Sequence, residues 1–401
     1  MTEIWTLSAL WLGLALIASM LAIWLRIASA LSEIVVGAIA QVAIGAVLGA
    51  AFLNGDATWI KYLSGAGAIL LTFLAGAELD PVVFRQQWKQ TCVIGLISFC
   101  APFIGCAALA RWALGWSPEA SWLAGVAMST TSVAVVYAVM LEFGLNTTEY
   151  GKLVLAACFI CDLATVLALG LIFAPFTIRT LIFVVAAVAA FVALPWATPR
   201  FFQRFGGRPS ELEAKFLMFT LFGLGALASW ADSEPVLPAY FLGMVLAGTV
   251  GKDHALVRRL RTLTFGLLTP FYFIRAGSLV SVPALAAAPA AFFVLLAGKL
   301  STKIIGVYPV TRAYRSPPQE GMYTTLLMST GLTFGTISAL FGLSHQIISQ
   351  AQYSTLVAVV IASAVVPTLI ANALFLPRHL LPGRREDAAA SAPQTATGGA
   401  T

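Results

Sequence analysis

Long apolar runs follow one another along most of the chain, and charged residues, prolines and glycines separate them. A helix that crosses a membrane needs about 20 mostly apolar residues. Cutting the chain at its charges and helix breakers gives roughly 13 runs of that length. The pattern therefore predicts an all-α polytopic membrane protein with about 13 transmembrane helices.

Two stretches about 200 residues apart resemble each other. Residues 127–132 read AMSTTS, residues 327–332 read LMSTGL, and a Phe-Gly-Leu follows each. Ala75-Gly76 and Ala276-Gly277 match in nearly the same register. Several matches in one register indicate an internal repeat of about five helices. An odd number of crossings makes the second copy upside down relative to the first, as in inverted-repeat secondary transporters.

This repeat divides the chain into five predicted parts. They are an N-terminal helix at 1–33, a first inverted repeat at 34–172, linking helices at 173–235, a second inverted repeat at 236–377 and a cytoplasmic tail at 378–401. The first helix has no basic residue before it and no small-residue cleavage site after it, so we expect it to be retained. The tail is rich in Ala, Thr and Gly, which favours disorder.

Polar and glycine-containing interruptions occur in the fourth helix of each repeat. Inverted-repeat transporters bind their substrate near the midplane, where interrupted helices meet and offer free carbonyls. The residues we assign to this crossing are Ser129, Thr131 and Ser132 in the first repeat and Ser329, Thr330, Gly331 and Thr333 in the second. The alternative is that these hydroxyls only hydrogen-bond to their own helix.

One acid lies near the centre of an apolar run. Asp162 follows Cys161 in a segment that extends from about residue 150 to 172. Acids at that depth usually face the protein interior and serve as ion or proton sites. A carboxylate there can hold a proton or a cation but not both, and this competition is sufficient for exchange. The alternative role for Asp162 is half of a permanent ion pair.

Three basic residues also fall within apolar runs. Lys299 and Lys303 lie one helical turn apart on the same face, and we expect Lys303 to lie opposite Asp162. Lys299 either takes part in transport or extends its amine to a polar surface. Arg275 lies near a helix end, where it can reach the interface, pair with an acid or bind a carbonyl of a broken helix.

Two further acids, Glu78 and Asp80, lie at the predicted cytoplasmic end of their helix, near Arg85. They are candidates for gathering cations at the mouth of the path. The alternative is that they cap the helix or form ion pairs in the loop, which contribute little.

Composition supports lipid as the solvent of this chain, because 60% of its residues are hydrophobic and only 10% are charged. The net charge of +6 reflects orientation rather than nucleic-acid binding. Placing the N-terminus outside puts 17 of the 23 lysines and arginines on the cytoplasmic side. We therefore expect a multi-pass protein of the inner (cytoplasmic) membrane, with its N-terminus outside and its C-terminus in the cytoplasm.

Signals of enzymes and cofactors are missing from the sequence. The five cysteines have no metal-ligand spacing, the three histidines are scattered, and no phosphate loop or dinucleotide fingerprint occurs. We expect a transporter that is not an enzyme, needs no cofactor and binds no metal beyond the transported Na⁺ or K⁺.

The chain resembles the monovalent cation:proton antiporter-2 family, which includes Kef-type potassium/proton and Nap-type sodium/proton exchangers. The motifs that carry the resemblance, in order, are FLAGAELDP (73–81), STTSVAVV (129–136), the pair Cys161-Asp162, FLGMVLAG (241–248), KIIGVYPVTR (303–312) and MSTGLTFGTI (328–337). The resemblance implies an antiporter in which Asp162 carries the ion, beside Thr131 and Ser132, and in which Lys303 is the lysine of the long core helix. It also implies a homodimer with an elevator-like motion.

The chain departs from the family at Cys161, where electrogenic members have a second acid. With one titratable carboxylate we predict electroneutral exchange of one cation for one proton. The second departure is the C-terminal tail, which replaces the nucleotide-binding domain of Kef-type proteins. Two other functions stay open: an organic-anion symporter that uses Lys303 and Arg275, and a channel or transport-inactive sensor.

Overall fold

The computed structural model describes residues 2–25, 27–48, 52–77, 87–173, 177–287 and 289–381, and these residues form helices and turns without any strand. The helices are α1 (Thr2–Leu25), α2 (Ser29–Leu48), α3 (Thr58–Ala77), α5 (Trp88–Ala108), α6 (Pro118–Ser129), α7 (Val133–Glu142), α8 (Glu149–Phe173), α9 (Ile178–Phe205), α10 (Leu212–Trp230), α11 (Val236–Leu246), α12 (His254–Leu263), α13 (Thr269–Ser278), α14 (Val282–Ala287), α15 (Pro289–Ala313), α16 (Pro318–Met328), α17 (Thr333–Ser344) and α18 (Gln350–Ile370).

Ten helical segments in the described part of the chain are long and apolar enough to cross a membrane. The segment expected at 150–172 is α8, which begins and ends within one residue of those bounds. The helix α11 is apolar but has only 11 residues. The all-helical membrane fold expected from the sequence is confirmed, while the count of about 13 crossings stays a prediction.

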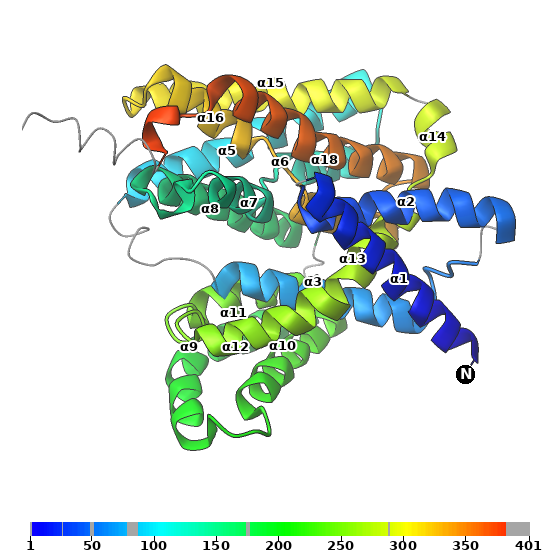
Figure 1. The fold of residues 1–401 in the computed structure, drawn as a ribbon, viewed down its shortest axis with the longest axis vertical. Coiled ribbons are helices and arrows are strands. Elements are labelled where there is room, and N and C mark those ends of the chain that lie inside the picture. Colours follow the sequence, from blue (N-terminus) through cyan, green and yellow to red (C-terminus); the bar gives the residue numbers. More distant parts are fainter. Residues whose placement is uncertain are drawn as a thin grey trace, which may run out of the picture.

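The helices form two groups, seen above and below one another in Figure 1. The upper group contains α5 to α8 and α15 to α18, which we call the crossing unit. The lower group contains α3 and α9 to α13. These helices, together with α1 and α2, which pack against α13, are called the scaffold unit. Each unit contains helices from both halves of the chain.

Glycines bring two helix pairs of the scaffold unit into backbone contact. An added Cβ on Gly243 of α11 would overlap with the carbonyl of Phe73 on α3, and one on Gly76 would overlap with the carbonyl of Tyr240. Gly37 of α2 and Gly277 of α13 approach each other's helices in the same way. Gly76 and Gly277 are the glycines that the sequence repeat aligned, so their equivalent packing supports that repeat.

The two interrupted helices meet inside the crossing unit. The first breaks between α6 and α7, where Thr130 has an extended backbone, and the second breaks between α16 and α17. The hydroxyl of Thr131 in the first break donates a 2.9 Å hydrogen bond to the carbonyl of Met328, at the end of α16. The predicted crossing of interrupted helices is therefore present.

Two faces of the molecule can be distinguished by the chain ends and loops. We call the face near the start of α1 the N-terminal side; it contains the loops at 52–57, 231–235 and 345–349. The opposite side contains residues 143–148 and the short turn at Arg378–Leu380, where His379 contacts Glu320. Glu78, Asp80 and the predicted tail from 382 onward lie outside the described residues.

Candidate functional site at the helix crossing

Asp162 lies on α8 beside the first helix break, with only 2% of its surface exposed. The backbone N–H groups of Thr131 and Val133 face its carboxyl group. Its Oδ1 atom is buried and has no hydrogen-bond partner among the described residues. Because buried polar atoms are nearly always paired, this oxygen is available to a ligand.

Lys303 of α15 is fully buried, and its ammonium group is surrounded by oxygen atoms from other helices. It donates to the Ser98 hydroxyl at 2.7 Å, the Ser129 carbonyl at 2.9 Å and the Thr131 hydroxyl at 3.1 Å. An ammonium group has three N–H donors, so these contacts use all of them. Lys303 therefore binds the first helix break and α5, and none of these acceptors is the Asp162 carboxylate that we expected opposite it.

Cys161 lies beside both this ammonium group and the first break. Its sulfur lies 3.8 Å from Lys303 Nζ and 3.3 Å from the Ser129 carbonyl. Thr131 Oγ1 lies 3.3 Å from the same sulfur. The position preceding Asp162 is thus part of the site, but a thiol supplies no second carboxylate there.

Most of the hydroxyls at the crossing bond within their own helix. Four of them donate to a carbonyl three or four residues earlier, namely those of Ser129, Thr130, Ser329 and Thr330. These side chains follow the alternative considered from the sequence, since they satisfy local carbonyls. Ser132 accepts a hydrogen bond of 3.4 Å from Val135 N–H at the start of α7. Thr333 is the first residue of α17, on the far side of the second break.

Lys299 lies one turn before Lys303 and has no hydrogen-bond partner for its Nζ among the described residues. Its side chain is fully buried. The ammonium nitrogen occupies the space beside Gly331 in the second break, since an added Cβ there would overlap with it. Ser363 of α18 lies near the same break, with its hydroxyl 3.5 Å from the Gly331 carbonyl.

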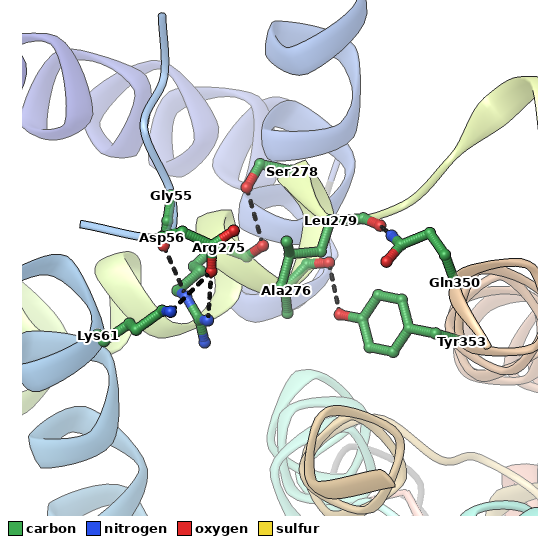
Figure 2. A network of polar contacts seen from close by, with 9 residues as sticks. All are labelled: Gly55, Asp56, Lys61, Arg275, Ala276, Ser278, Leu279, Gln350 and Tyr353. Carbon is green, nitrogen blue, oxygen red and sulfur yellow. Dashed lines mark hydrogen bonds and ion pairs between the residues drawn. The ribbon is translucent and has the colours of Figure 1, made fainter. Parts of the chain in front are cut away.

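Arg275 lies at the end of α13 on the N-terminal side, as Figure 2 shows. Its Nε donates to the Gly55 carbonyl at 2.8 Å, and its guanidinium lies 3.5 Å from Asp56 Oδ1. Lys61 forms a 3.0 Å ion pair with the same carboxylate. The contact with Lys61, and to a smaller extent that with Arg275, holds the pKa of Asp56 below its usual value. Arg275 therefore pairs with an acid and a carbonyl in a loop, and in the described part of the chain it shares no hydrogen-bond partner with Lys303.

Sequence reasoning missed Ser98 and Tyr240. Ser98 is the only hydroxyl residue between 92 and 113, and that isolation in an apolar helix was the available signal. Tyr240 of α11 donates a 3.1 Å hydrogen bond to the Phe159 carbonyl, and its ring also stacks on Phe159, one turn before Asp162. This contact connects the scaffold unit to the helix that carries Asp162.

Comparison with known families agrees with this architecture. The profile of the family described as "Sodium/hydrogen exchanger, transmembrane" matches residues 9–376. In structure, the chain is similar to the sodium proton antiporter MjNhaP1 from Methanocaldococcus jannaschii, with a TM-score of 0.70 and 14% sequence identity. That likeness covers 94% of this chain and 99% of the other. At 14% sequence identity it shows that the two proteins have a similar fold.

Curated relatives are similar over shorter parts of their length. A probable Na⁺/H⁺ antiporter 3 from Methanocaldococcus jannaschii is 25% identical, over 54% of this chain and 58% of that protein. The glutathione-regulated potassium-efflux system protein KefC of Salmonella arizonae is 25% identical, over 70% of this chain and 47% of its own. Cation/H⁺ antiporter 18 of Arabidopsis thaliana is 24% identical, over 83% of this chain and 43% of that protein. The chain thus spans about half the length of these relatives.

Proposed function

Because the chain belongs to the transmembrane sodium/hydrogen exchanger family, we propose that it exchanges a monovalent cation, Na⁺ or K⁺, for H⁺ across the membrane. The observation that carries this proposal is Asp162 Oδ1, a buried carboxylate oxygen without a partner among the described residues, at the crossing of two interrupted helices. Protons and alkali cations compete for that oxygen. Relatives named as Na⁺/H⁺ antiporters and as a potassium-efflux protein support the substrate class.

The exchange is electroneutral in this proposal. Lys303 has an oxygen acceptor for each of its three N–H groups, and hydrogen bonds to the charged form favour that form. In this proposal Lys303 keeps its charge while Asp162 alternates between a proton and a cation. One positive charge then moves in each direction during a cycle, because Cys161 adds no second carboxylate.

Alternating access places Asp162 in contact with one side of the membrane at a time. The crossing unit carries Asp162 and both helix breaks, so it is the part that moves, while the scaffold unit with its close glycine contacts stays fixed. Thr131, Ser132, Ser129 and Cys161 accompany Asp162 in the first break. Ser329, Thr330, Gly331 and Thr333 form the second break, next to Lys299.

The protein is proposed to lie in the inner membrane as a homodimer, with its N-terminus outside. The bias of lysines and arginines supports this orientation. The helices α1 and α9 leave most of their surface exposed, as expected for helices that face lipid or a second subunit.

Purified protein in liposomes tests the function. A pH gradient is imposed, and Na⁺, K⁺ or Li⁺ is added in turn. The transported cation should collapse the gradient with wild type and with the control Glu119→Gln, which changes an exposed acid at the start of α6. Asp162→Asn should abolish the collapse. Collapse with Asp162→Asn would contradict the site, and a dependence of the rate on membrane voltage would contradict electroneutrality.

A further inference from the structure

A cavity of about 130 Å³ lies between the two units on the N-terminal side. The scaffold unit contributes Lys61, Ser64, Gly65 and Ala68 of α3, Tyr272 and Arg275 of α13 and Glu234 of the loop before α11. The crossing unit contributes the outer half of α17, from Ile337 to Ser344, and His345. Since a water molecule takes up about 30 Å³, the cavity has room for roughly four waters or a partly hydrated cation.

The cavity extends from the surface toward the crossing. Ser344 and His345 are exposed at its outer end, whereas Ile337 is buried at its inner end. Ile337 lies four residues, or about 6 Å of helix, after Thr333 at the second break. Beyond it, Phe334 packs edge-on against Tyr240, which stacks on Phe159 of the Asp162 helix. Three packed aromatic side chains therefore separate the inner end of the cavity from the helix that carries Asp162.

Two polar groups that line this cavity can bind a cation. The Tyr272 hydroxyl is buried and has no hydrogen-bond partner among the described residues, although only 2% of Tyr272 is exposed. Glu234 is partly buried and close enough to Tyr272 for its charge to act on the phenol. A carboxylate oxygen and a phenolic oxygen are hard ligands, suited to an alkali cation and its water.

The basic groups around the cavity already have partners among the described residues. Lys61 and Arg275 both pair with Asp56, and Arg275 also binds the Gly55 carbonyl (Figure 2). The Nδ1 atom of His345 contacts the Phe341 carbonyl at 3.0 Å. Once Asp56 is paired in this way, Glu234 is the acid that determines how the cavity attracts cations.

We propose that this cavity is a waiting site for the exchanged cation on the N-terminal side, where the Glu234 carboxylate and the Tyr272 hydroxyl hold the ion before it reaches Asp162. This inference rests on the proposed exchange function. Glu234 attracts protons and cations alike. It therefore promotes the entry of both ions from the N-terminal side and leaves the ratio of cations to protons exchanged in each cycle unchanged.

The charge of the waiting site depends on pH. Burial raises the pKa of Glu234 to about 7. A raised pKa means that the carboxylate is charged above about pH 7 and neutral below it. Asp56, whose pKa is lowered by its contact with Lys61, keeps its charge over this range. Attraction of the cation by Glu234 is therefore strong at pH 8 and weak at pH 6.

Sided transport tests the proposal. Exchange is measured in right-side-out and everted vesicles, with the N-terminal side identified by a tag, at constant ionic strength. Glu234→Gln should raise the KM for the cation by roughly fivefold from the N-terminal side at pH 8, as expected for loss of one contact charge in water-like surroundings. At pH 6 the variant and wild type should have the same KM, and from the opposite side the KM should be unchanged at both values of pH.

Three variants complete the test. Asp232→Asn changes an exposed acid two residues away, at a positive φ of 52° that Asn accepts, and should leave the KM unchanged. Glu234→Asp keeps the charge and should retain the difference between pH 8 and pH 6. Tyr272→Phe should raise the KM from the N-terminal side at both values of pH, because the phenol stays neutral over this range.

The waiting site would be overturned by an equal change of KM from both sides for Glu234→Gln, or by the same increase for Asp232→Asn. A wild-type KM for Glu234→Gln at pH 8 would do so as well. These outcomes are separate from failure of the proposed function, which is decided by whether Asp162→Asn still exchanges ions.

Discussion

Lys303 donates a 2.9 Å hydrogen bond to the carbonyl of Ser129, so an ammonium group on α15 contacts the last residue of the half-helix α6. Carbonyls at a helix C-terminus carry a partial negative charge that favours a cation. The first break thus has a fixed positive charge beside it, and Asp162 faces the same break from α8.

The two buried lysines should have opposite effects on stability. Lys303→Met leaves three acceptors without their donor and should destabilise the protein by about 1–3 kcal/mol. Lys299→Met removes a buried amine that has no partner among the described residues and should stabilise the protein by about 1–4 kcal/mol, as with other buried charges replaced by apolar side chains. Thermal unfolding of the purified variants in detergent measures both, and a lower melting temperature for Lys299→Met would show that its amine has a partner.

Gly331→Ala should impair transport through the amine of Lys299. An added Cβ overlaps with Lys299 Nζ and lies 2.7 Å from Thr130 Oγ1, so the Lys299 side chain or the second break has to shift. Methionine is one atom shorter than lysine, so Lys299→Met in the same chain should restore part of the lost activity. A double-mutant cycle on exchange rates checks this coupling, and additive effects of the two substitutions would contradict it.

Cys161→Asp should make the exchange sensitive to voltage. The new carboxylate would lie where the thiol now lies, 3.8 Å from Lys303 Nζ, so the site would contain two acids and could return two protons for one cation. Exchange rates in vesicles under membrane voltages of either sign provide the measurement. Cys161→Ser is the neutral control and should stay insensitive to voltage, as should wild type.

Tyr353→Phe should loosen the contact between the two units on the N-terminal side. The Tyr353 hydroxyl on α18 donates a 2.8 Å hydrogen bond to the Ala276 carbonyl on α13, as Figure 2 shows. Losing this hydrogen bond costs about 0.5–1.5 kcal/mol, which raises the equilibrium constant for separation of the two units at this contact by up to roughly tenfold. Hydrogen exchange should accelerate by that factor in peptides covering residues 278–284 and 349–356. Tyr314→Phe, at an exposed tyrosine, should leave these peptides unchanged.

The sequence predicted the membrane spans because each one requires an uninterrupted apolar run, and α8 matches its expected segment within one residue at each end. The helix breaks were also predictable, since hydroxyl residues recur at 129–132 and 329–332, with a glycine at 331. Asp162 was found because acids are rare at that depth. These features are local, so the order of residues is enough to locate them.

The partners of the buried cations could not be predicted in this way. Ser98 lies 205 positions before Lys303, and their contact depends on how α5 packs against α15. Arg275 pairs with Asp56, which reads as an ordinary loop acid, and Glu234 gave no signal for the same reason. Long-range packing decides which polar groups meet, and one sequence alone contains no record of it.

The backbone contacts at Gly37, Gly76, Gly243 and Gly277 constrain how this chain can change during evolution. Every single-nucleotide missense change in a glycine codon adds a β-carbon, and at these four positions the neighbouring carbonyl already occupies that space. No single-nucleotide substitution at these positions avoids the overlap. In a library of variants selected for growth, substitutions at all four codons should therefore be rare, whichever ion the cells are challenged with.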